Sequence, residues 1–260
     1  MSNWNLWHGC HKYSEGCKNC YVYRIDSSHG RSDSFIVRKN SDFDLPVKKD
    51  KNGGYKLKPE DGTVFTCMTS DFFVEDADCW RDEAWSMIKS RPDLNFCIVT
   101  KRISQARERL PLDWGDGYEN VAIACTMESR RTVDERLPIF LSLPVKRRLI
   151  FCAPLLEEIS LKGRLAGIDL VSVGGESGNS ARPCKWEWVE KLYVDCLESG
   201  TGFHYHQIGS NFIKDGRTYR LPHGKQFDQA GKAQKLLEKL YGKPKRLPFD
   251  QTGAALKLNF

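Results

Sequence analysis

Short apolar runs alternate with longer amphipathic segments along this 260-residue chain from about Gly62 onward. The apolar runs are rich in Val, Ile, Phe and Cys and are too short for helices, so they are typical of buried parallel strands. The predicted strands are Val64–Met68, Asn95–Thr100, Val121–Thr126, Arg148–Ala153, Leu170–Val173 and Gly202–Gln207. The amphipathic segments predict helices at Cys79–Ser90, Ile103–Arg109, Ser129–Leu143, Trp186–Ser199 and Asp228–Tyr241.

Strands that each lead into a helix form βα units, and a succession of them predicts an α/β fold. We expect a parallel (β/α) barrel, full or partial, of TIM type. Trp4–His8 is the candidate first strand of the barrel and Ser34–Arg38 the candidate second strand. The polar stretch Asp42–Asp61 is expected to be a hairpin-like excursion or a loop. The barrel domain is expected to cover residues 1–210, with a basic C-terminal extension, residues 211–260, packed on it.

Polar residues follow the predicted strands at the point where each strand ends. Active sites of parallel barrels gather at the carboxyl ends of the strands, so these residues are expected to lie near one another. Single residues also have structural explanations: Asp71 can cap a helix, and His204 and His206 share one face of a strand and fit satisfied core histidines. The candidate site residues are Ser70, Asp71, Lys101, Arg102, Glu128, Gly174, Gly175 and Glu176.

Three of the ten cysteines, Cys10, Cys17 and Cys20, are clustered near the amino terminus. Three thiolates can hold a cubane iron–sulfur cluster and leave its fourth iron open to a small molecule. The same three can hold zinc with a histidine as fourth ligand, and His8 and His11 are close enough in sequence to serve. Residue types and spacing leave both metal centres open. Several of the other cysteines lie in apolar runs, where they are expected to be small buried hydrophobes.

The cysteine pattern is not the loop-based disulfide framework of a secreted protein. The sequence shows neither a signal peptide nor an apolar run of membrane-spanning length, so we expect a cytoplasmic protein without a membrane segment. The net charge is +6, and residues 211–250 carry ten Lys or Arg against four Asp or Glu. Charge alone favours a solvated surface, but a basic segment of this kind also fits a nucleic-acid partner.

The cysteine segment resembles a known signature. The residues Trp7-His-Gly-Cys10 and Gly16-Cys17-Lys-Asn-Cys20-Tyr21 are similar to the motif of the phage- and bacteria-associated three-Cys-motif family, which is radical-SAM-like and described as a domain of unknown function. The resemblance extends from about Trp4 to Pro222. Further matching segments are Met68–Phe73, Val99–Arg102, Pro154–Leu156, Gly174–Gly178 with Ala181–Pro183, and Phe203–Gly209.

The resemblance implies a radical-SAM enzyme with a [4Fe–4S] cluster on Cys10, Cys17 and Cys20 and with S-adenosyl-L-methionine (SAM) as second cofactor. In such enzymes the reduced cluster cleaves SAM, and the resulting 5′-deoxyadenosyl radical abstracts hydrogen from the substrate. A flavodoxin or ferredoxin is the implied reductant. Lys101 or Arg102 would meet the SAM carboxylate, and Tyr21 is the candidate for stacking on adenine. The implied cofactor-binding set is Tyr21, Ser70, Asp71, Lys101, Arg102, Glu128, Gly174, Gly175 and Glu176.

The sequence departs from the general radical-SAM pattern. Six and then two residues separate its cysteines instead of three and then two, and Asn19 stands where an aromatic residue is common. The Gly-Gly-Glu element follows a late strand, and His206 occupies a position where the family often has lysine. Two alternatives therefore stay open: a non-catalytic zinc- or iron–sulfur-binding barrel that binds nucleic acid or a protein partner, and a barrel whose cluster is only structural. The catalytic residues are unknown, and the substrate is a nucleic acid or nucleotide, a peptide or a small metabolite.

Overall fold

The computed structural model describes residues 2–244 of the chain, which divide into two compact units. Within these residues, unit 1 comprises 2–14, 22–125 and 139–147, and unit 2 comprises 15–21, 126–138 and 148–244. The predicted domain boundary after residue 210 falls inside unit 2, and the last part of the predicted extension, residues 245–260, lies outside the described residues. Cys10 belongs to unit 1, whereas Cys17 and Cys20 belong to unit 2.

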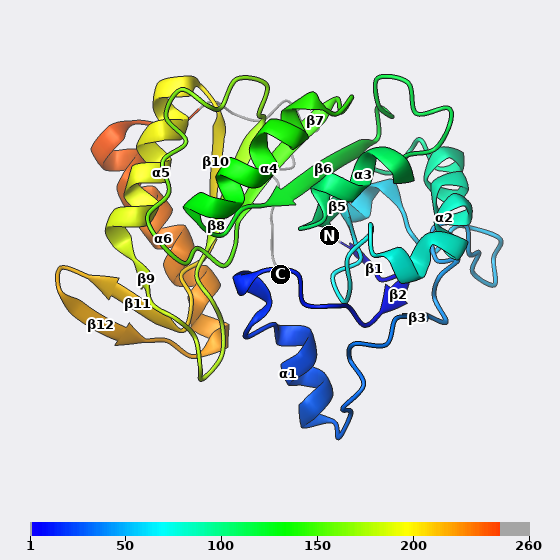
Figure 1. Cartoon of the computed structure of the whole chain (residues 1–260), viewed down its shortest axis with the longest axis horizontal. Coiled ribbons are helices and arrows are strands. Elements are labelled where there is room, and N and C mark those ends of the chain that lie inside the picture. Colours follow the sequence, from blue (N-terminus) through cyan, green and yellow to red (C-terminus); the bar gives the residue numbers. More distant parts are fainter. Residues whose placement is uncertain (1, 245–260) are drawn as a thin grey trace. The chain divides into compact units, whose positions relative to one another are not determined.

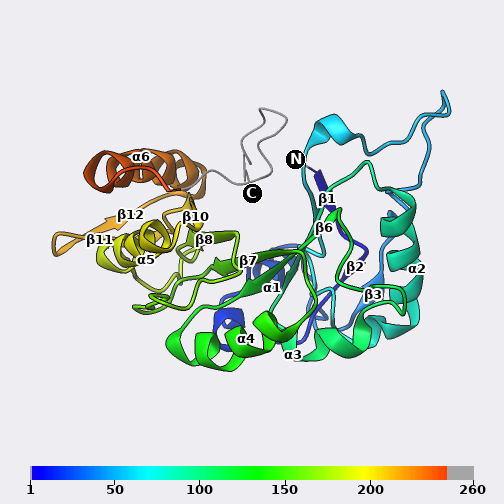
Figure 2. The same cartoon turned by 90° about the horizontal axis from the view of Figure 1, so that it is seen from above.

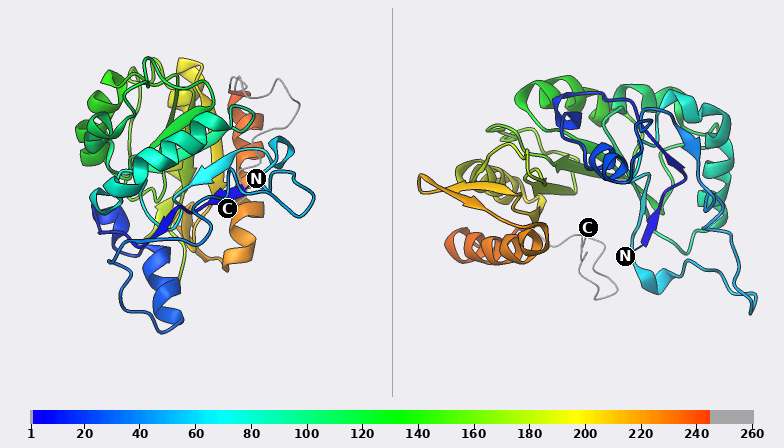
Figure 3. Two further views of the ribbon diagram at one scale, coloured as in Figure 1. Left: turned by 90° about the vertical axis from the view of Figure 1, so that its right-hand side faces the viewer. Right: turned by 90° about the horizontal axis from the view of Figure 1, so that it is seen from below.

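Unit 1 contains parallel strands that are neighbours in the order β1, β4, β5, β6 (Figure 1). β4, β5 and β6 are almost wholly buried, which is why they form continuous apolar runs in the sequence. Figures 2 and 3 show the helices that follow β4 and β5 on one side of the strands. The elements are β1 (Ser2–Trp4), β4 (Val64–Thr66), η3 (Glu75–Ala77), α2 (Asp78–Ser90), β5 (Phe96–Thr100), α3 (Ile103–Ala106), η4 (Arg107–Arg109) and β6 (Val121–Thr126).

Residues between β1 and β4 form short elements outside the main set of parallel strands. β2 (Trp7–His8) pairs antiparallel with β3 (Arg38–Lys39), and α1 (Tyr21–Ser28) precedes β3. The prediction of a barrel strand at Ser34–Arg38 is wrong, because a turn closed by the bond from Ile36 N to Asp33 O occupies its first half. The expected excursion is confirmed as hairpin-like: Lys49 and Tyr55 form an antiparallel bridge, and η2 (Pro59–Asp61) follows it.

Unit 2 contains three further parallel strands in the order β7, β8, β10, and a small sheet in the order β12, β11, β9. Helix α6 packs against β10, and Figures 2 and 3 show the β11–β12 hairpin beside α6. Helix α4 contains Pro138, where the division between the units falls. The elements are η1 (Glu15–Cys17), α4 (Arg130–Ser142), β7 (Arg147–Cys152), β8 (Leu170–Gly174), β9 (Cys184–Lys185), α5 (Trp186–Ser199), β10 (Gly202–Gln207), β11 (Asn211–Lys214), β12 (Arg217–Arg220) and α6 (His223–Tyr241).

The predicted α/β class with parallel strands is confirmed, and each strand expected after Gly62 is present. Helix α6 begins at His223, five residues earlier than the predicted Asp228, because Pro222 at its start is compatible with a helix amino terminus. Within residues 2–244, no helix combines the length and the apolar character that a membrane span requires.

Candidate functional site

The Cys10 loop of unit 1 is fixed by close backbone packing. Gly9 has a φ of +92°, and a Cβ there would lie 2.1 Å from the carbonyl oxygen of Ile36, so only glycine fits this turn. The backbone N of Cys10 donates to Ser34 O at 2.8 Å, and Ser70 Oγ donates to Gly9 O at 2.5 Å. These contacts hold Cys10 in a half-buried position. They also bring Ser70, one of the candidate site residues, against the Cys10 loop.

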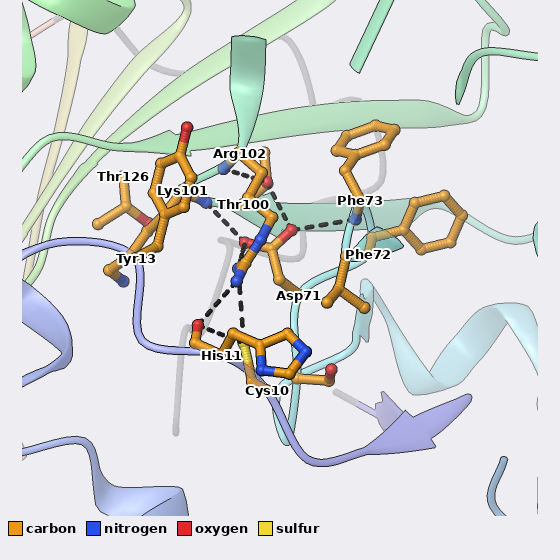
Figure 4. A network of polar contacts seen from close by, with 12 residues as sticks. Cys10, His11, Tyr13, Asp71, Phe72, Phe73, Thr100, Lys101, Arg102 and Thr126 are labelled. Carbon is orange, nitrogen blue, oxygen red and sulfur yellow. Dashed lines mark hydrogen bonds and ion pairs between the residues drawn. The ribbon is translucent and has the colours of Figure 1, made fainter. Parts of the chain in front are cut away.

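Asp71 organises the ends of β4 and β5 (Figure 4). Its carboxylate is only 4% exposed and accepts hydrogen bonds from Thr100 Oγ1 at 2.7 Å and from the backbone N of Lys101 at 2.9 Å. The backbone N of Phe73 donates to the same group at 3.0 Å, and Arg102 Nη1 lies 3.4 Å from Oδ2. Asp71 does not cap the helix that follows, because the N-cap of α2 is Ala77. Its carboxylate instead closes its own turn through Phe73 N and joins two neighbouring strand ends.

Arg102 connects this carboxylate to the cysteine loop. Its side chain is 6% exposed, and Nη1 donates to Cys10 Sγ at 3.5 Å while Nη2 donates to His11 O at 2.7 Å. The guanidinium carbon also lies 4.9 Å from the centre of the Tyr13 ring, within the range of a cation–π contact. Figure 4 shows Arg102 between Asp71 and the Cys10–His11 backbone. The sequence placed Arg102 near the cluster but gave no sign that it contacts a cysteine.

Both candidate histidine ligands are held by carboxylates. His8 Nε2 lies 2.7 Å from Asp26 Oδ2, and Ser34 Oγ donates to the same oxygen at 2.7 Å. Burial disfavours the charged form of Asp26, but the bonds from Ser34 and His8 outweigh it and keep its pKa below the ordinary value. His11 Nε2 lies 2.8 Å from the exposed Asp76. A carboxylate on one ring nitrogen is the usual support of a metal-binding histidine, so zinc remains an alternative.

Cys17 and Cys20 share a single turn in unit 2. The backbone N of Cys20 donates to Cys17 O at 3.3 Å, and both side chains are half-buried and free of disulfides. Glu15, at the start of the turn, accepts hydrogen bonds from Ser129 Oγ at 2.5 Å and from Arg131 Nη2 at 2.6 Å. These two bonds lower the pKa of Glu15, and the bond from Ser129 has the larger effect. The cysteine pair is therefore anchored to the loop and helix that follow β6.

Gly16 packs directly on Glu128. A Cβ at Gly16 would lie 2.7 Å from Glu128 Oε1, which makes glycine necessary at this position. Glu128 is fully buried, and Arg136 Nη1 donates to its Oε2 at 2.7 Å. The buried ion pair supports the turn that carries Cys17. The predicted role of Glu128 as a cofactor contact stays a prediction.

Glu176, after β8, holds the same cysteine turn from another side. Its Oε2 accepts hydrogen bonds from Asn19 Nδ2 at 2.9 Å and from Arg182 Nε at 3.0 Å, and its Oε1 accepts one from Arg182 Nη2 at 2.5 Å. Burial disfavours ionisation of Glu176, but the bonds from Arg182 and Asn19 outweigh it and lower its pKa. Asn19, which stands where radical-SAM proteins commonly have an aromatic residue, thus anchors the turn to the Gly-Gly-Glu element.

We expect Glu176→Gln to lower the free energy of unfolding at pH 7 by about 1.5–3 kcal/mol, because charge-assisted bonds from Arg182 are lost. The folded-state pKa of Glu176 lies below its ordinary value of 4.5, so this contribution is present above that pH and is lost as the pH falls through the folded pKa. Urea denaturation at pH 7, 5 and 3 should show that the difference in unfolding free energy between variant and wild type becomes smaller as the pH falls. The exposed Glu187→Gln is the control, and a gap independent of pH would contradict the assignment.

His204 and His206 lie side by side on β10, with ring centres 6.3 Å apart. Burial lowers the pKa of His204 to about 4 and, together with the neighbouring His204, that of His206 to about 3, so both rings are neutral near pH 7. His206 lies over Gly174, where a Cβ would be 2.3 Å from its Cε1. His206 is buried and His204 is half-buried, and Gly174 is needed to make room for the His206 ring.

The predicted site residues thus fall into two sets. In unit 1, Ser70 and Arg102 bond to the Cys10 loop, and Asp71 bonds to Arg102 and to the backbone of Lys101. In unit 2, Glu176 binds the Cys17–Cys20 turn, which Glu128 also supports. Tyr21 begins α1 and is 39% exposed. Sequence reasoning missed the residues that anchor these loops, because no hydrophobic or motif spacing pairs them with their partners, and Glu15 and Asn19 bond across 114 and 157 positions. The missed residues are Glu15, Asn19, Asp26, Ser129, Arg136 and Arg182.

The three motif cysteines differ from the other seven in their surroundings. Six of the others are buried, and burial raises the pKa of Cys97 and of Cys184 to about 12, which disfavours thiolates there. Cys79 is exposed but stands outside the motif. Among residues 2–244, no three His, Cys, Asp or Glu side chains are already gathered as a metal-binding group. Cys10, Cys17 and Cys20 are half-buried and free of disulfides, and cysteine is the residue type that holds iron–sulfur clusters.

One protein-family model, DUF5131, described as a protein of unknown function, matches residues 1–239. No curated protein and no solved structure matches the chain.

Proposed function

The chain belongs to the DUF5131 family, and we propose that it is a radical-SAM-like enzyme with a [4Fe–4S] cluster on Cys10, Cys17 and Cys20. The observation that carries the proposal is that each motif cysteine is half-buried, uncrosslinked and held in a loop anchored to strand ends. A partial (β/α) barrel of radical-SAM type and a reductant of the flavodoxin or ferredoxin class are parts of the same proposal.

The bound cofactors would supply reductive cleavage of SAM and hydrogen abstraction. The protein's own residues position the ligands: Asp71 and Arg102 hold the Cys10 loop, and Glu176 holds the Cys17–Cys20 turn. Ser70 bonds to Gly9 of the first loop and Lys101 bonds to Asp71, and in this proposal both contact SAM. Tyr21, Gly174 and Gly175 are proposed to do so in unit 2.

The test is an anaerobic preparation of the chain with iron and sulfide analysis, followed by reduction with dithionite in the presence of SAM. About four irons per chain, a broad absorption band near roughly 400 nm and release of 5′-deoxyadenosine are expected. If the protein contains an iron–sulfur cluster but releases no 5′-deoxyadenosine, the proposed cluster stands and the proposed enzymatic activity is overturned.

A zinc protein is the second candidate, because His8, two residues before Cys10 in the chain, bonds to the buried Asp26 as a zinc-binding histidine bonds to a carboxylate. A colourless, air-stable chain with one zinc would favour it over the enzyme. Loss of zinc in His8→Ala but not in His11→Ala would then identify His8 as the fourth ligand.

We propose nucleic acid as the substrate class on the basis of a basic surface in unit 2. Helix α6 carries Lys225, Lys232 and Lys239 at seven-residue intervals, so these exposed side chains lie on one face. Strand β12 is exposed along its whole length and contributes Arg217 and Arg220. Exposed cations spaced along one helix face and one edge strand complement a phosphate backbone.

The double variant Arg217→Glu/Arg220→Glu is expected to weaken binding of a 20-nucleotide DNA, single-stranded or duplex. Each lost phosphate contact should reduce the slope of log K against log salt by about one. Fluorescence anisotropy at several salt concentrations measures both quantities. Lys51→Glu/Lys56→Glu changes the charge equally at exposed positions of unit 1 and should bind like wild type. Binding that does not weaken with salt, or equal losses in both variants, would contradict the assignment.

A further inference from the structure

Arg102 is held in one conformation by contacts within unit 1. Asp71 accepts three other hydrogen bonds, from Thr100 and from the backbone of Phe73 and Lys101, which fix the carboxylate that faces the guanidinium. The backbone N of Arg102 also donates to Thr100 Oγ1 at 2.8 Å. The cation is therefore preorganised at the end of β5, and little of its conformational freedom is left to lose on ligand binding.

The fixed guanidinium makes two contacts with the cysteine loop. Nη1 donates to Cys10 Sγ at 3.5 Å, and Nη2 donates to His11 O at 2.7 Å, so the sulfur and the following carbonyl are held by one planar group (Figure 4). A lysine ammonium is a single point donor and cannot reproduce this fork geometry. The Tyr13 ring near the guanidinium further restricts it.

We infer that Arg102 is a positioning residue for Cys10 that also sets the electron affinity of the cluster. The inference rests on the proposed function, since it takes Cys10 as a cluster ligand. Hydrogen bonds and positive charge at a ligand sulfur stabilise the more negatively charged, reduced form of a cluster and so raise its reduction potential. Arg102 thus lowers the demand placed on the reductant. This role differs from contact with the SAM carboxylate, because its side-chain donors face Asp71, Cys10 and His11.

The experiment compares the reconstituted full-length wild type with Arg102→Gln and Arg102→Lys by a potentiometric titration followed by electron paramagnetic resonance. We expect a lower midpoint potential in Arg102→Gln at equal iron content, and a smaller decrease in Arg102→Lys, which keeps the charge opposite Asp71 and guards against a folding failure. Arg107→Gln, on the exposed turn after α3, is the matched control and should keep the wild-type potential. Equal potentials in wild type and both Arg102 variants would overturn the inference.

Hydrogen–deuterium exchange of the metal-free chain separates this inference from the proposed function. Arg102→Gln should speed amide exchange at residues 9–14, because the bond to His11 O and the contact with Cys10 Sγ are lost. Unchanged exchange would overturn the positioning role even where a cluster is present. A wild type that binds no iron would overturn the proposed function and the effect on potential, whereas faster exchange in the variant would still support the positioning role.

Discussion

Cys17→Ala is expected to abolish cluster binding, with iron and sulfide falling from about four per chain to near zero and with no 5′-deoxyadenosine formed. When one of three cysteine ligands is removed, one more iron of the cubane is left without a protein ligand. Cys20 alone then remains on the turn closed by the bond between Cys20 N and Cys17 O. The fold of the turn should persist, because its anchors are the contacts of Glu15 and Asn19 and not the thiol itself. Iron and acid-labile sulfide assays after anaerobic reconstitution provide the measurement.

Cys79→Ala is the matched control for this prediction. Cys79 is also free and is more exposed than the motif cysteines, so it is at least as available to adventitious metal. We expect its iron content and absorption spectrum to equal those of wild type. A Cys17→Ala chain that keeps its cluster, or a Cys79→Ala chain that loses it, would remove Cys17 from the ligand set.

The parallel strands could be predicted from the sequence because burial on both faces leaves a continuous apolar run. Val121–Thr126 and Leu170–Gly174 are buried at every position, and their predicted bounds are nearly those observed. The strand predicted at Ser34–Arg38 failed for the converse reason. Phe35 and Ile36 are apolar but exposed, and the turn that contains them is set by contacts with the Cys10 loop, which the local pattern does not record.

The site was predictable to the extent that strand ends attract polar residues. Asp71, Arg102 and Glu176 were singled out by their place after strands, and each makes several buried polar contacts. Their partners were not predictable. Asn19 meets Glu176 across 157 positions of sequence, so no local spacing could indicate the bond. The unusual residue between Cys17 and Cys20 was the available signal, and it pointed to a missing aromatic ring instead of a hydrogen bond.

These contacts give the strand-end residues a supporting role that precedes any chemistry. Arg102 and Glu176 belong to different units, and each bonds to a residue of the cysteine segment. Both side chains are largely buried and engaged by partners of opposite charge, Asp71 and Arg182. A charge held in this way orients a neighbouring loop at low entropic cost. Loss of either charge should therefore change the cysteine loops before it changes the parallel strands.

Asp71→Ala, in unit 1, is expected to lower the free energy of unfolding of the protein by about 3–5 kcal/mol, because it leaves the buried Arg102 without its carboxylate. The donors of Thr100, Lys101 and Phe73 also lose their acceptor in a nearly dry site. Urea denaturation followed by tryptophan fluorescence reports largely on this unit, since the buried Trp85 and Trp114 rings pack 5.2 Å apart within it.

Asp76→Ala separates burial from charge in the same measurement. Asp76 also pairs with a residue of the cysteine loop, His11, but the pair is exposed on both sides, so its loss should cost at most about 1 kcal/mol. Asp71→Asn should fall between the two alanine variants, because the amide keeps one acceptor oxygen but loses the charge opposite Arg102. If Asp71→Ala and Asp76→Ala shifted the unfolding transition equally, Asp71 would be a surface-like carboxylate, and the Cys10 loop would owe its position to the Gly9 and Ser34 backbone contacts instead.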